Sequence, residues 1–266
     1  MTGQGSLLRA VDRSVGVYGT APTCFLSALA RVPDLTLDQF NGAVADRELV
    51  RIRAMRYSVY TFTAELLPIA AAATTRLARR MNPYRKRLGD RYEALAARVD
   101  EALSDGPLPA VGIRSRIDPD QELGELFSVL LGMAAADHRI VRTTTTGSWR
   151  SDRFLYARWC DWLPGIDPGT FDAPGAMRTL VQRYVAAYGP VTIDDVRWWT
   201  GWSKPETLEA TDGIDLTQRG SALDDIRGLH LLPVWDVLLV AYHNRDRFLD
   251  PDYGPLVYDR FGNATS

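Results

Sequence analysis

Apolar residues along the chain recur at helical spacing and then give way to short runs in which apolar and polar residues alternate. The first such stretch begins at Thr36, which we expect to cap a helix because Gln39 lies three residues later, the spacing of a capping box. The apolar stripe of this helix is formed by Leu37, Phe40, Val44 and Leu49. The segment LVRIRAMRYSVYTF (49–62) then alternates, which predicts β-strand structure.

A second stretch of the same kind starts at Asp118, which we expect to cap an apolar helix that runs to about Ala136. The β-branched run HRIVRTTTT (138–146) and the run RFLYARW (153–159) predict two strands. Gly147 marks the turn between them. A helix followed by a strand, an arginine-bearing turn and a second strand is the outline of a winged helix.

A third unit is predicted around TIDDVRWWTGWSKPETLEA (192–210). Thr192 caps one helix, Gly201 provides a tight turn, and Ser203 caps the next helix, which is the pattern of a helix-turn-helix. Three tryptophans fall in this stretch, namely Trp198, Trp199 and Trp202. We expect two of the three to serve packing.

These patterns predict a mainly α-helical protein with short β-hairpins, of the α+β class, built from tandem winged-helix units. A chain of 266 residues has room for two or three such units. We place a first winged helix and a basic helical connector at residues 1–105 and a second winged helix at 106–172. A third winged-helix or helix-turn-helix unit, with the start of a C-terminal β region, is expected at 173–266.

The charge is uneven along the chain, although the net charge is only −2. Residues 1–160 hold 22 Lys and Arg against 17 Asp and Glu, and residues 161–266 hold 9 against 16. Arginine supplies nearly all the positive charge, and its planar fork suits phosphate and aromatic rings. The residues that we expect to contact DNA are Arg51, Arg53, Arg56, Arg85, Lys86, Arg87, Arg142, Trp149, Arg150, Arg153 and Lys204.

Three of these residues, Arg85, Lys86 and Arg87, lie in a basic connector at 74–103, and Asn82-Pro83 is expected to divide this connector into two helices. Two interpretations of its charge stay open: a solvated helix face, or a helix that contacts phosphate. For the uneven charge of the two halves of the chain, the alternatives are a basic front half that faces phosphate and ordinary scatter of charge.

Cysteine and histidine are too sparse to suggest a metal centre or a disulfide framework. Cys24 and Cys160 lie far apart, which is typical of a reducing, cytoplasmic setting. The three histidines have no metal-ligand spacing, and we expect neither metal nor cofactor. No apolar run is long enough to cross a bilayer, and the N-terminus lacks a signal-peptide core, so we expect no membrane association.

Asp236 is unusual because it interrupts the apolar run from Leu231 to Val240. A carboxylate in such surroundings is costly unless it is paired or hydrogen-bonded. The nearby candidates for a partner are His243, Arg245 and Arg247. Asp236 is therefore either a working acid or a structural acid that bonds loop amides.

The chain resembles the winged-helix DNA glycosylases of the AlkZ/YcaQ type over most of its length. The resemblance lies in ALARVPDLT and ADRELVRIRAMR within 28–56, GSWRSDRFLYARWCDWLP (147–164), LVQRYVAAYGPVTIDDVRWWTGWSK (180–204) and LLPVWDVLLVAYHNRDRFLD (231–250). The last of these is similar to a Pro-x-aromatic-Asp segment of that family. The resemblance implies a protein that removes or recognises alkylated or crosslinked purines in double-stranded DNA and works as a monomer.

Two departures from the family stand out. The catalytic signature of the family is Gln-apolar-Gln or Gln-apolar-Asp, and its place here falls at Tyr18-Gly19-Thr20. We expect the hydroxyls of Tyr18 and Thr20, together with Asp236, to line the catalytic site. The family also continues into a C-terminal β-barrel and a DNA-probing hairpin, whereas this sequence ends at Ser266, so we expect the barrel to be incomplete or absent.

Three functions are compatible with these features. The first is a DNA glycosylase that serves base excision or self-resistance to a genotoxin. The second is a non-catalytic relative that binds DNA or a genotoxic small molecule, which the missing glutamines favour. The third is a winged-helix transcription regulator, against which three such units and the lack of an effector segment argue.

Overall fold

The computed structural model describes residues 3–80, 85–220, 231–246 and 248–259. The first part of the chain follows the order helix, strand, helix, helix, strand, strand. These elements are α1 (Gly3–Arg13), β1 (Val17–Tyr18), α2 (Thr23–Leu29), α3 (Leu37–Ala45), β2 (Leu49–Arg53) and β3 (Val59–Thr63). The predicted capping box at the start of α3 is confirmed, with hydrogen bonds in both directions between Thr36 and Gln39.

The predicted strand region at 49–62 is a hairpin rather than one strand. A short 3-10 helix, Met55–Tyr57, separates β2 from β3. Arg56 and Tyr57 have φ values of 53° and 60°, a left-handed backbone that an extended strand cannot contain. The turn therefore presents the Arg56 side chain at the end of the hairpin.

The same order of elements returns after a helical connector. The connector consists of α4 (Leu67–Arg80), α5 (Arg85–Leu88) and a 3-10 helix at Gly89–Arg91, and the predicted break at Asn82-Pro83 lies outside the described residues. The second set of elements is α6 (Tyr92–Ala102), β4 (Leu108–Pro109), α7 (Ala110–Ile117), α8 (Leu126–Ala136), β5 (Ile140–Thr145) and β6 (Phe154–Arg158).

The start of the predicted apolar helix is wrong, although its end at Ala136 is right. Asp118 ends α7 instead of capping α8, and its carboxylate accepts a hydrogen bond from the Leu123 amide at 3.2 Å. Gln121 and Gly124 both have positive φ values, so the chain between Asp118 and Leu126 turns instead of continuing as a helix.

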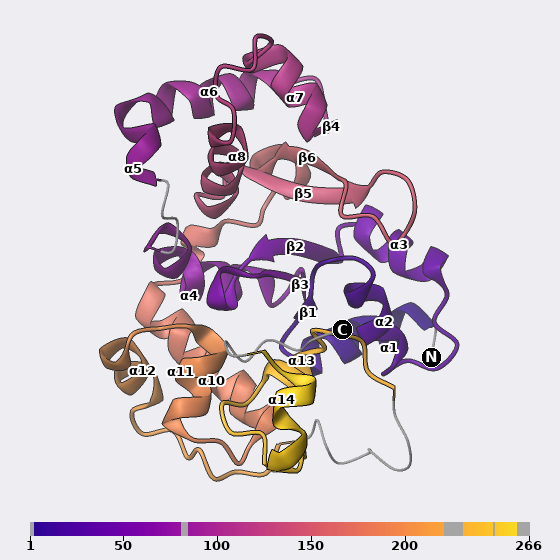
Figure 1. Cartoon of the computed structure of the whole chain (residues 1–266), viewed down its shortest axis with the longest axis vertical. Helices are drawn as coiled ribbons and strands as arrows, with labels where there is room; N and C mark the ends of the chain where they lie inside the picture. The colour runs from indigo at the N-terminus through magenta and orange to yellow at the C-terminus, as the bar shows by residue number, and fades with distance from the viewer. Residues whose placement is uncertain (1–2, 81–84, 221–230, 247, 260–266) are drawn as a thin grey trace.

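One antiparallel sheet joins the two sets of elements (Figure 1). The strand order is β1-β3-β2-β5-β6-β4, and the two hairpins meet where Arg51 of β2 pairs with Arg142 of β5. The outer strands, β1 and β4, have two residues each, which leaves little exposed edge for pairing with other chains. The sequence predicts the second hairpin but only a strand region for the first, and it does not predict that the two hairpins share a sheet.

A helical unit follows. Its elements are α9 (Trp159–Trp162), a 3-10 helix at Pro168–Thr170, α10 (Ala173–Tyr188), α11 (Ile193–Thr200) and α12 (Lys204–Thr211). Thr192 caps α11 and Ser203 caps α12, as predicted, and each residue belongs to a capping box, which was not predicted. Gly201 makes the turn between them with a φ of 78°, and a Cβ there would meet Arg56 Cα at 3.2 Å. This glycine is therefore required both by its backbone and by its close approach to the β2–β3 turn.

The C-terminal segment is helical and irregular. It contains α13 (Val237–Val240), a 3-10 helix at Pro251–Tyr253 and α14 (Gly254–Val257). Within residues 173–220, 231–246 and 248–259 no β-strand is present, so the described part of this segment does not form a barrel.

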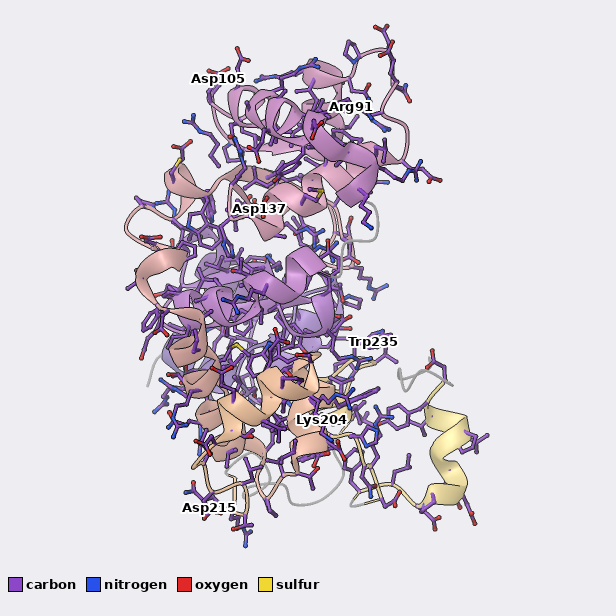
Figure 2. The ribbon with its side chains drawn as sticks, turned by 90° about the vertical axis from the view of Figure 1, so that its left-hand side faces the viewer. Arg91, Asp105, Asp137, Lys204, Asp215 and Trp235 are labelled. Carbon is purple, nitrogen blue, oxygen red and sulfur yellow. The ribbon has the colours of Figure 1, made fainter. Side chains whose placement is uncertain are left out.

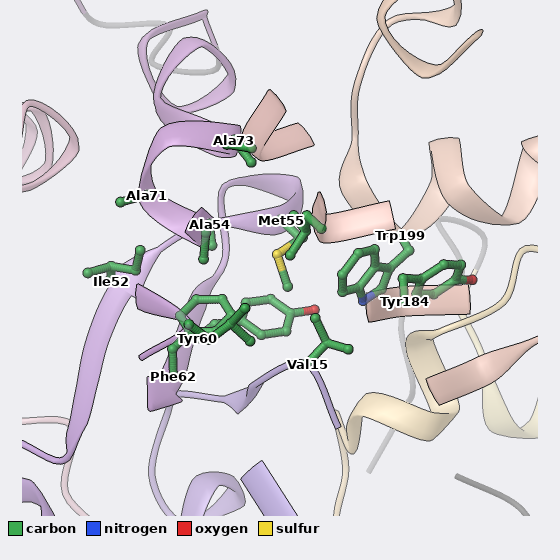
Figure 3. Packing of buried hydrophobic residues seen from close by; sticks show 14 of the residues in the cluster. Val15, Ile52, Ala54, Met55, Tyr60, Phe62, Ala71, Ala73, Tyr184 and Trp199 are labelled. Atoms are coloured by element: carbon green, nitrogen blue, oxygen red, sulfur yellow. The ribbon is translucent and has the colours of Figure 1, made fainter. Parts of the chain in front are cut away.

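The largest hydrophobic cluster joins the first hairpin to the helical unit (Figure 3). Trp199 of α11 stacks on Tyr184 of α10 with ring centroids 4.5 Å apart, close to Met55 and Tyr60 from the first hairpin. Trp199 and Trp202 are buried and Trp198 is half-buried, which confirms that two of the three tryptophans serve packing. Two smaller clusters fill the α1–α3 region and the α5–α8 region.

Candidate active site and nucleic-acid interface

Tyr18 meets the segment that carries Asp236, although the two lie at opposite ends of the sequence. The ring of Tyr18 stacks on Trp235, with centroids 5.6 Å apart and planes 17° from parallel. Its hydroxyl donates a hydrogen bond to Ser58 Oγ at 3.2 Å. Thr20 is half-buried two residues further on, and its carbonyl accepts a hydrogen bond from the Cys24 amide at the start of α2. The fold thus brings the three predicted catalytic positions into one region.

Asp236 is fully buried and has a complete set of hydrogen-bond donors. Arg31 donates to both carboxylate oxygens, at 2.7 Å to Oδ2 and 2.8 Å to Oδ1. Ser27 Oγ donates to Oδ2 at 2.7 Å, and the Leu238 amide donates to Oδ1 at 2.9 Å at the start of α13. Asp236 therefore fastens the C-terminal segment to α2.

The expected partners of Asp236 are wrong, because Arg31 takes that role. The His243 amide donates to Asp195 Oδ1 instead, Arg245 lies over Tyr258, and Arg247 lies outside the described residues. Burial disfavours the charge on Arg31, but its hydrogen bond to Asp236 and the charge of that carboxylate outweigh burial and raise the Arg31 pKa above its usual value.

Trp235 and Tyr60 complete the surroundings of Tyr18, and neither was singled out from the sequence. Trp235 has a φ of 66°, a left-handed conformation that is rare for an aromatic residue and is held here by its neighbours. The Tyr60 ring lies 5.6 Å from that of Tyr18. Burial, and to a lesser degree the neighbouring Tyr18, raises the pKa of Tyr60 well above 10, so its phenol stays protonated. The aromatic of the Pro-x-aromatic-Asp segment was the available signal for Trp235.

The tip of the second hairpin reaches back to this region. Asp152 Oδ1 accepts a hydrogen bond from the amide of Ala21, the residue after Thr20, at 2.7 Å. Trp149 packs edge-on against Phe25 of α2 with centroids 5.6 Å apart, and Arg150 lies over the Trp149 ring. Asp152 is exposed, and it brings a carboxylate next to Thr20. Asp152 was not predicted as a site residue, because it lies between Arg150 and Arg153 in a turn that we interpreted as cationic.

Three of the predicted DNA-contacting arginines gather at the seam between the two hairpins. Arg51 is 4% exposed, donates to the Thr143 carbonyl at 3.1 Å and lies over Phe154, so it supports the seam and is not a surface cation. Arg142 also lies over Phe154 and is half-buried. Burial lowers the pKa of Arg53, and the nearby charge of Arg142 lowers it further, which shows how closely these guanidinium groups approach each other.

The remaining predicted contacts lie in other parts of the fold. Arg56 belongs to the β2–β3 turn and stacks over Trp198 of α11, with Cζ 4.1 Å from the ring centroid. Lys86 and Arg87 are exposed on α5, whereas the side chain of Arg85 lies outside the described part. Arg153 is exposed beside Asp152, and Lys204 is exposed at the start of α12. Figure 2 shows Lys204 and Trp235 in the lower half of the molecule, away from Asp105 and Arg91.

The described residues contain neither a membrane-spanning helix nor a cluster of metal-ligating side chains. No described helix is long and apolar enough to cross a bilayer. Across the same ranges, no three His, Cys, Asp or Glu side chains lie close enough together to hold a metal ion.

Comparisons with known proteins agree with the resemblance noted from the sequence. No curated protein sequence matches the chain significantly. Among solved structures, the Streptomyces sahachiroi DNA glycosylase AlkZ matches with a TM-score of 0.74 and 18% sequence identity, over 98% of this chain and 78% of that chain. The model of the family described as DNA glycosylase AlkZ-like matches residues 11–265. The chain therefore belongs to the AlkZ-like DNA glycosylase family.

Proposed function

We propose that the protein is a DNA glycosylase that hydrolyses the N-glycosidic bond of an alkylated or crosslinked purine in double-stranded DNA. The two repeats of helix, strand, helix, helix, strand, strand are winged helices in this proposal, and α10–α12 form the third unit. The observation that carries it is the meeting of Tyr18, Thr20 and the tip of the second hairpin at the family's catalytic position.

The chemistry needs a held water and negative charge beside the sugar. In a 7-alkylguanine the base already carries positive charge, so it leaves as a neutral base with the electron pair of the bond between its N9 and C1′ of the sugar. Water then forms the new bond to C1′ and gives up a proton. Tyr18 and Thr20 supply hydroxyls that orient this water, and the Asp152 carboxylate accepts its proton and stabilises the cation-like sugar.

Asp236 has a positioning role in this proposal. Its oxygens are already bonded by Arg31, Ser27 and the Leu238 amide, and it is closed to water. It holds Trp235 against Tyr18 and so shapes the site without touching the reacting atoms.

The DNA backbone is bound mainly by the exposed and half-buried cations and by the aromatic hairpin tip. Electrostatic contact with phosphates accounts for most of the sequence-independent affinity of such proteins. The contacting residues are Arg53, Arg56, Lys86, Arg87, Arg142, Trp149, Arg150, Arg153 and Lys204. Arg85, whose side chain lies outside the described part, completes the set that the sequence predicts. Arg51 contributes indirectly, by holding the seam between the hairpins.

Base release from duplex DNA that carries 7-methylguanine tests the proposal. We expect the protein to release the base, and the Asp152→Asn or the Tyr18→Phe/Thr20→Val variant to lose that activity while remaining folded. Asp105→Asn is the matched control, because Asp105 is an exposed acid at the opposite end of the molecule.

A non-catalytic relative that binds DNA or a genotoxic small molecule is the second candidate. The observation in its favour is that Tyr18 and Thr20 stand where the family's glutamine signature is expected. Tight, salt-dependent binding of the lesion duplex without release of base would support it. A strong preference for one undamaged sequence would instead indicate a transcription regulator.

A further inference from the structure

A cleft of about 480 Å³ lies between the first hairpin and the α11–α12 turn, apart from the Tyr18 region. Its lining includes Arg56 from the β2–β3 turn and Trp198 and Trp202 from the third unit. Arg197 and His243 add positive or titratable groups, and Asp194 is the acid of the lining. Two aromatic rings and several cations in one cleft are a combination that suits an anion with a planar neighbour.

Trp198 lines this cleft and has two guanidinium groups over its ring. The Arg56 guanidinium lies 4.1 Å from its ring centroid and the Arg245 guanidinium 5.2 Å from it. The indole Nε1 donates to the Val240 carbonyl at 3.2 Å, which fixes the ring against α13. Two guanidinium groups on one ring place a concentration of positive charge at a defined position.

The two guanidinium groups on Trp198 also influence each other. Burial lowers the pKa of Arg245, and the positive charge of Arg56 lowers it further, whereas Tyr258 and Asp259 oppose this. The direction of this shift agrees with the short distances of both groups from the same ring.

Trp202 adds a second, independent indication. It is 4% exposed, lines the cleft, and its buried Nε1–H has no hydrogen-bond partner among the described residues. A buried donor without an acceptor is costly, and a phosphate oxygen is a strong acceptor.

The cleft is built rather than accidental. Gly201 adopts a φ of 78°, and its lack of a side chain lets the backbone of Arg56 come close. A Cβ on residue 201 would lie only 3.2 Å from Arg56 Cα. On the other side of the same turn, Ser58 accepts the hydrogen bond from Tyr18. The β2–β3 turn therefore connects the cleft directly with the candidate active site.

We propose that this cleft binds a phosphodiester of the DNA strand next to the nucleotide held at Tyr18, with Arg56 and Arg197 on the phosphate and Trp202 Nε1 as a donor. This inference rests on the proposed DNA binding but not on catalysis. An enzyme that extracts a nucleotide from a duplex needs a fixed grip on the backbone beside it, because unstacking costs energy.

The test is duplex affinity by fluorescence anisotropy, measured over a series of salt concentrations. Losing one phosphate contact should make the slope of log K against log salt less negative by about 0.9. We expect Arg56→Gln to do this and Asp194→Asn to tighten binding. The matched control is Arg116→Gln, since Arg116 pairs with exposed Asp105 at the far end of the molecule and should leave the slope unchanged.

Duplexes with one uncharged methylphosphonate linkage then locate the contact. For the unmodified protein, one linkage near the lesion should weaken binding, and for Arg56→Gln the same linkage should have no further effect. An Arg56→Gln variant that melts like Arg116→Gln and keeps the full salt slope would overturn the inference. If base release fails but the Arg56 slope change is present, the inference stands and the proposed catalysis falls. The reverse result rejects the cleft and removes Arg56 from the proposed DNA contacts, and it leaves the proposed catalysis standing.

Discussion

Two aspartates near the candidate site have opposite environments. Asp236 is fully buried and bonded by Arg31, Ser27 and the Leu238 amide, whereas Asp152 is exposed and accepts a hydrogen bond from the Ala21 amide. The sequence draws attention to Asp236, because a charge in an apolar run is conspicuous. It gives no prominence to Asp152, which lies in a polar turn.

A conspicuous buried acid such as Asp236 is more suited to stabilising the fold than to reacting. A carboxylate whose lone pairs are all occupied cannot accept a proton from water without losing a bond that it already makes. An exposed carboxylate at the junction of two segments keeps that capacity. Comparing stability with activity in variants of Asp236 and Asp152 separates the two roles.

The largest effect is expected for Asp236→Ala. Removing one partner leaves the mostly buried Arg31 without its counter-charge, which costs about 3–5 kcal/mol in the free energy of unfolding. Urea denaturation should show a lower midpoint with little change in slope. A joint Arg31→Met/Asp236→Leu variant should recover much of the loss, because apolar pairs often replace buried ion pairs. Unchanged stability in Asp236→Ala would contradict the structural role.

The second effect is expected for Asp152→Asn, and it concerns rate rather than stability. Asparagine keeps the oxygen that accepts from the Ala21 amide but lacks the charge. We expect base release to slow about 100-fold, the scale of losing one electrostatic group in an active site. The unfolding free energy should stay within about 0.5 kcal/mol of the unmodified protein. Equal rates for the two proteins would remove Asp152 from the proposed chemistry.

Much of the fold could be predicted from local signals. The capping residues Thr36, Thr192 and Ser203 and the glycine turn at Gly201 all function as their sequence context indicates. These signals act within a few residues, so a single sequence carries them. The start of α8 was missed because Asp118 ends α7 and its carboxylate accepts from the Leu123 amide instead of capping α8. The positive φ values of Gln121 and Gly124, which turn the chain before α8, are not visible in the pattern.

The candidate site depends on contacts that sequence patterning does not carry. The joining of β2 to β5, the pairing of Arg31 with Asp236 and the docking of Asp152 at Ala21 each link residues far apart in the chain. The resemblance pointed to Tyr18 and Thr20 as positions, but a single sequence does not show which acid reaches them.

A smaller effect is expected at alkaline pH, where buried tyrosines near the candidate site make the free energy of unfolding depend on pH. The pKa of Tyr60 is raised by burial, so above pH 10 the unfolded chain loses this proton before the folded chain does. Stability should therefore fall as pH rises, by about 1.4 kcal/mol per pH unit for each such tyrosine. Tyr60→Phe should flatten this dependence between pH 10 and 12, as should Tyr188→Phe, whose pKa burial also raises. An unchanged slope in both variants would argue against burial as the cause.

The smallest effect on base release is expected for Trp149, which packs the tip of the second hairpin, and with it the exposed Asp152, against α2. Trp149 packs edge-on against Phe25, and such a contact contributes about 0.5–1.5 kcal/mol beyond area burial. Trp149→Ala should loosen the tip that carries Asp152 and lower base release about 3–10-fold, less than Asp152→Asn does, because the carboxylate is still present for part of the time. Trp149→Phe keeps an aromatic edge and should recover most of the rate. Suppose that Trp149→Ala slows base release as much as Asp152→Asn and that the double variant is no slower than either single variant. The hairpin tip then acts only by placing Asp152. If the two rate effects multiply in the double variant, Trp149 contacts the DNA independently.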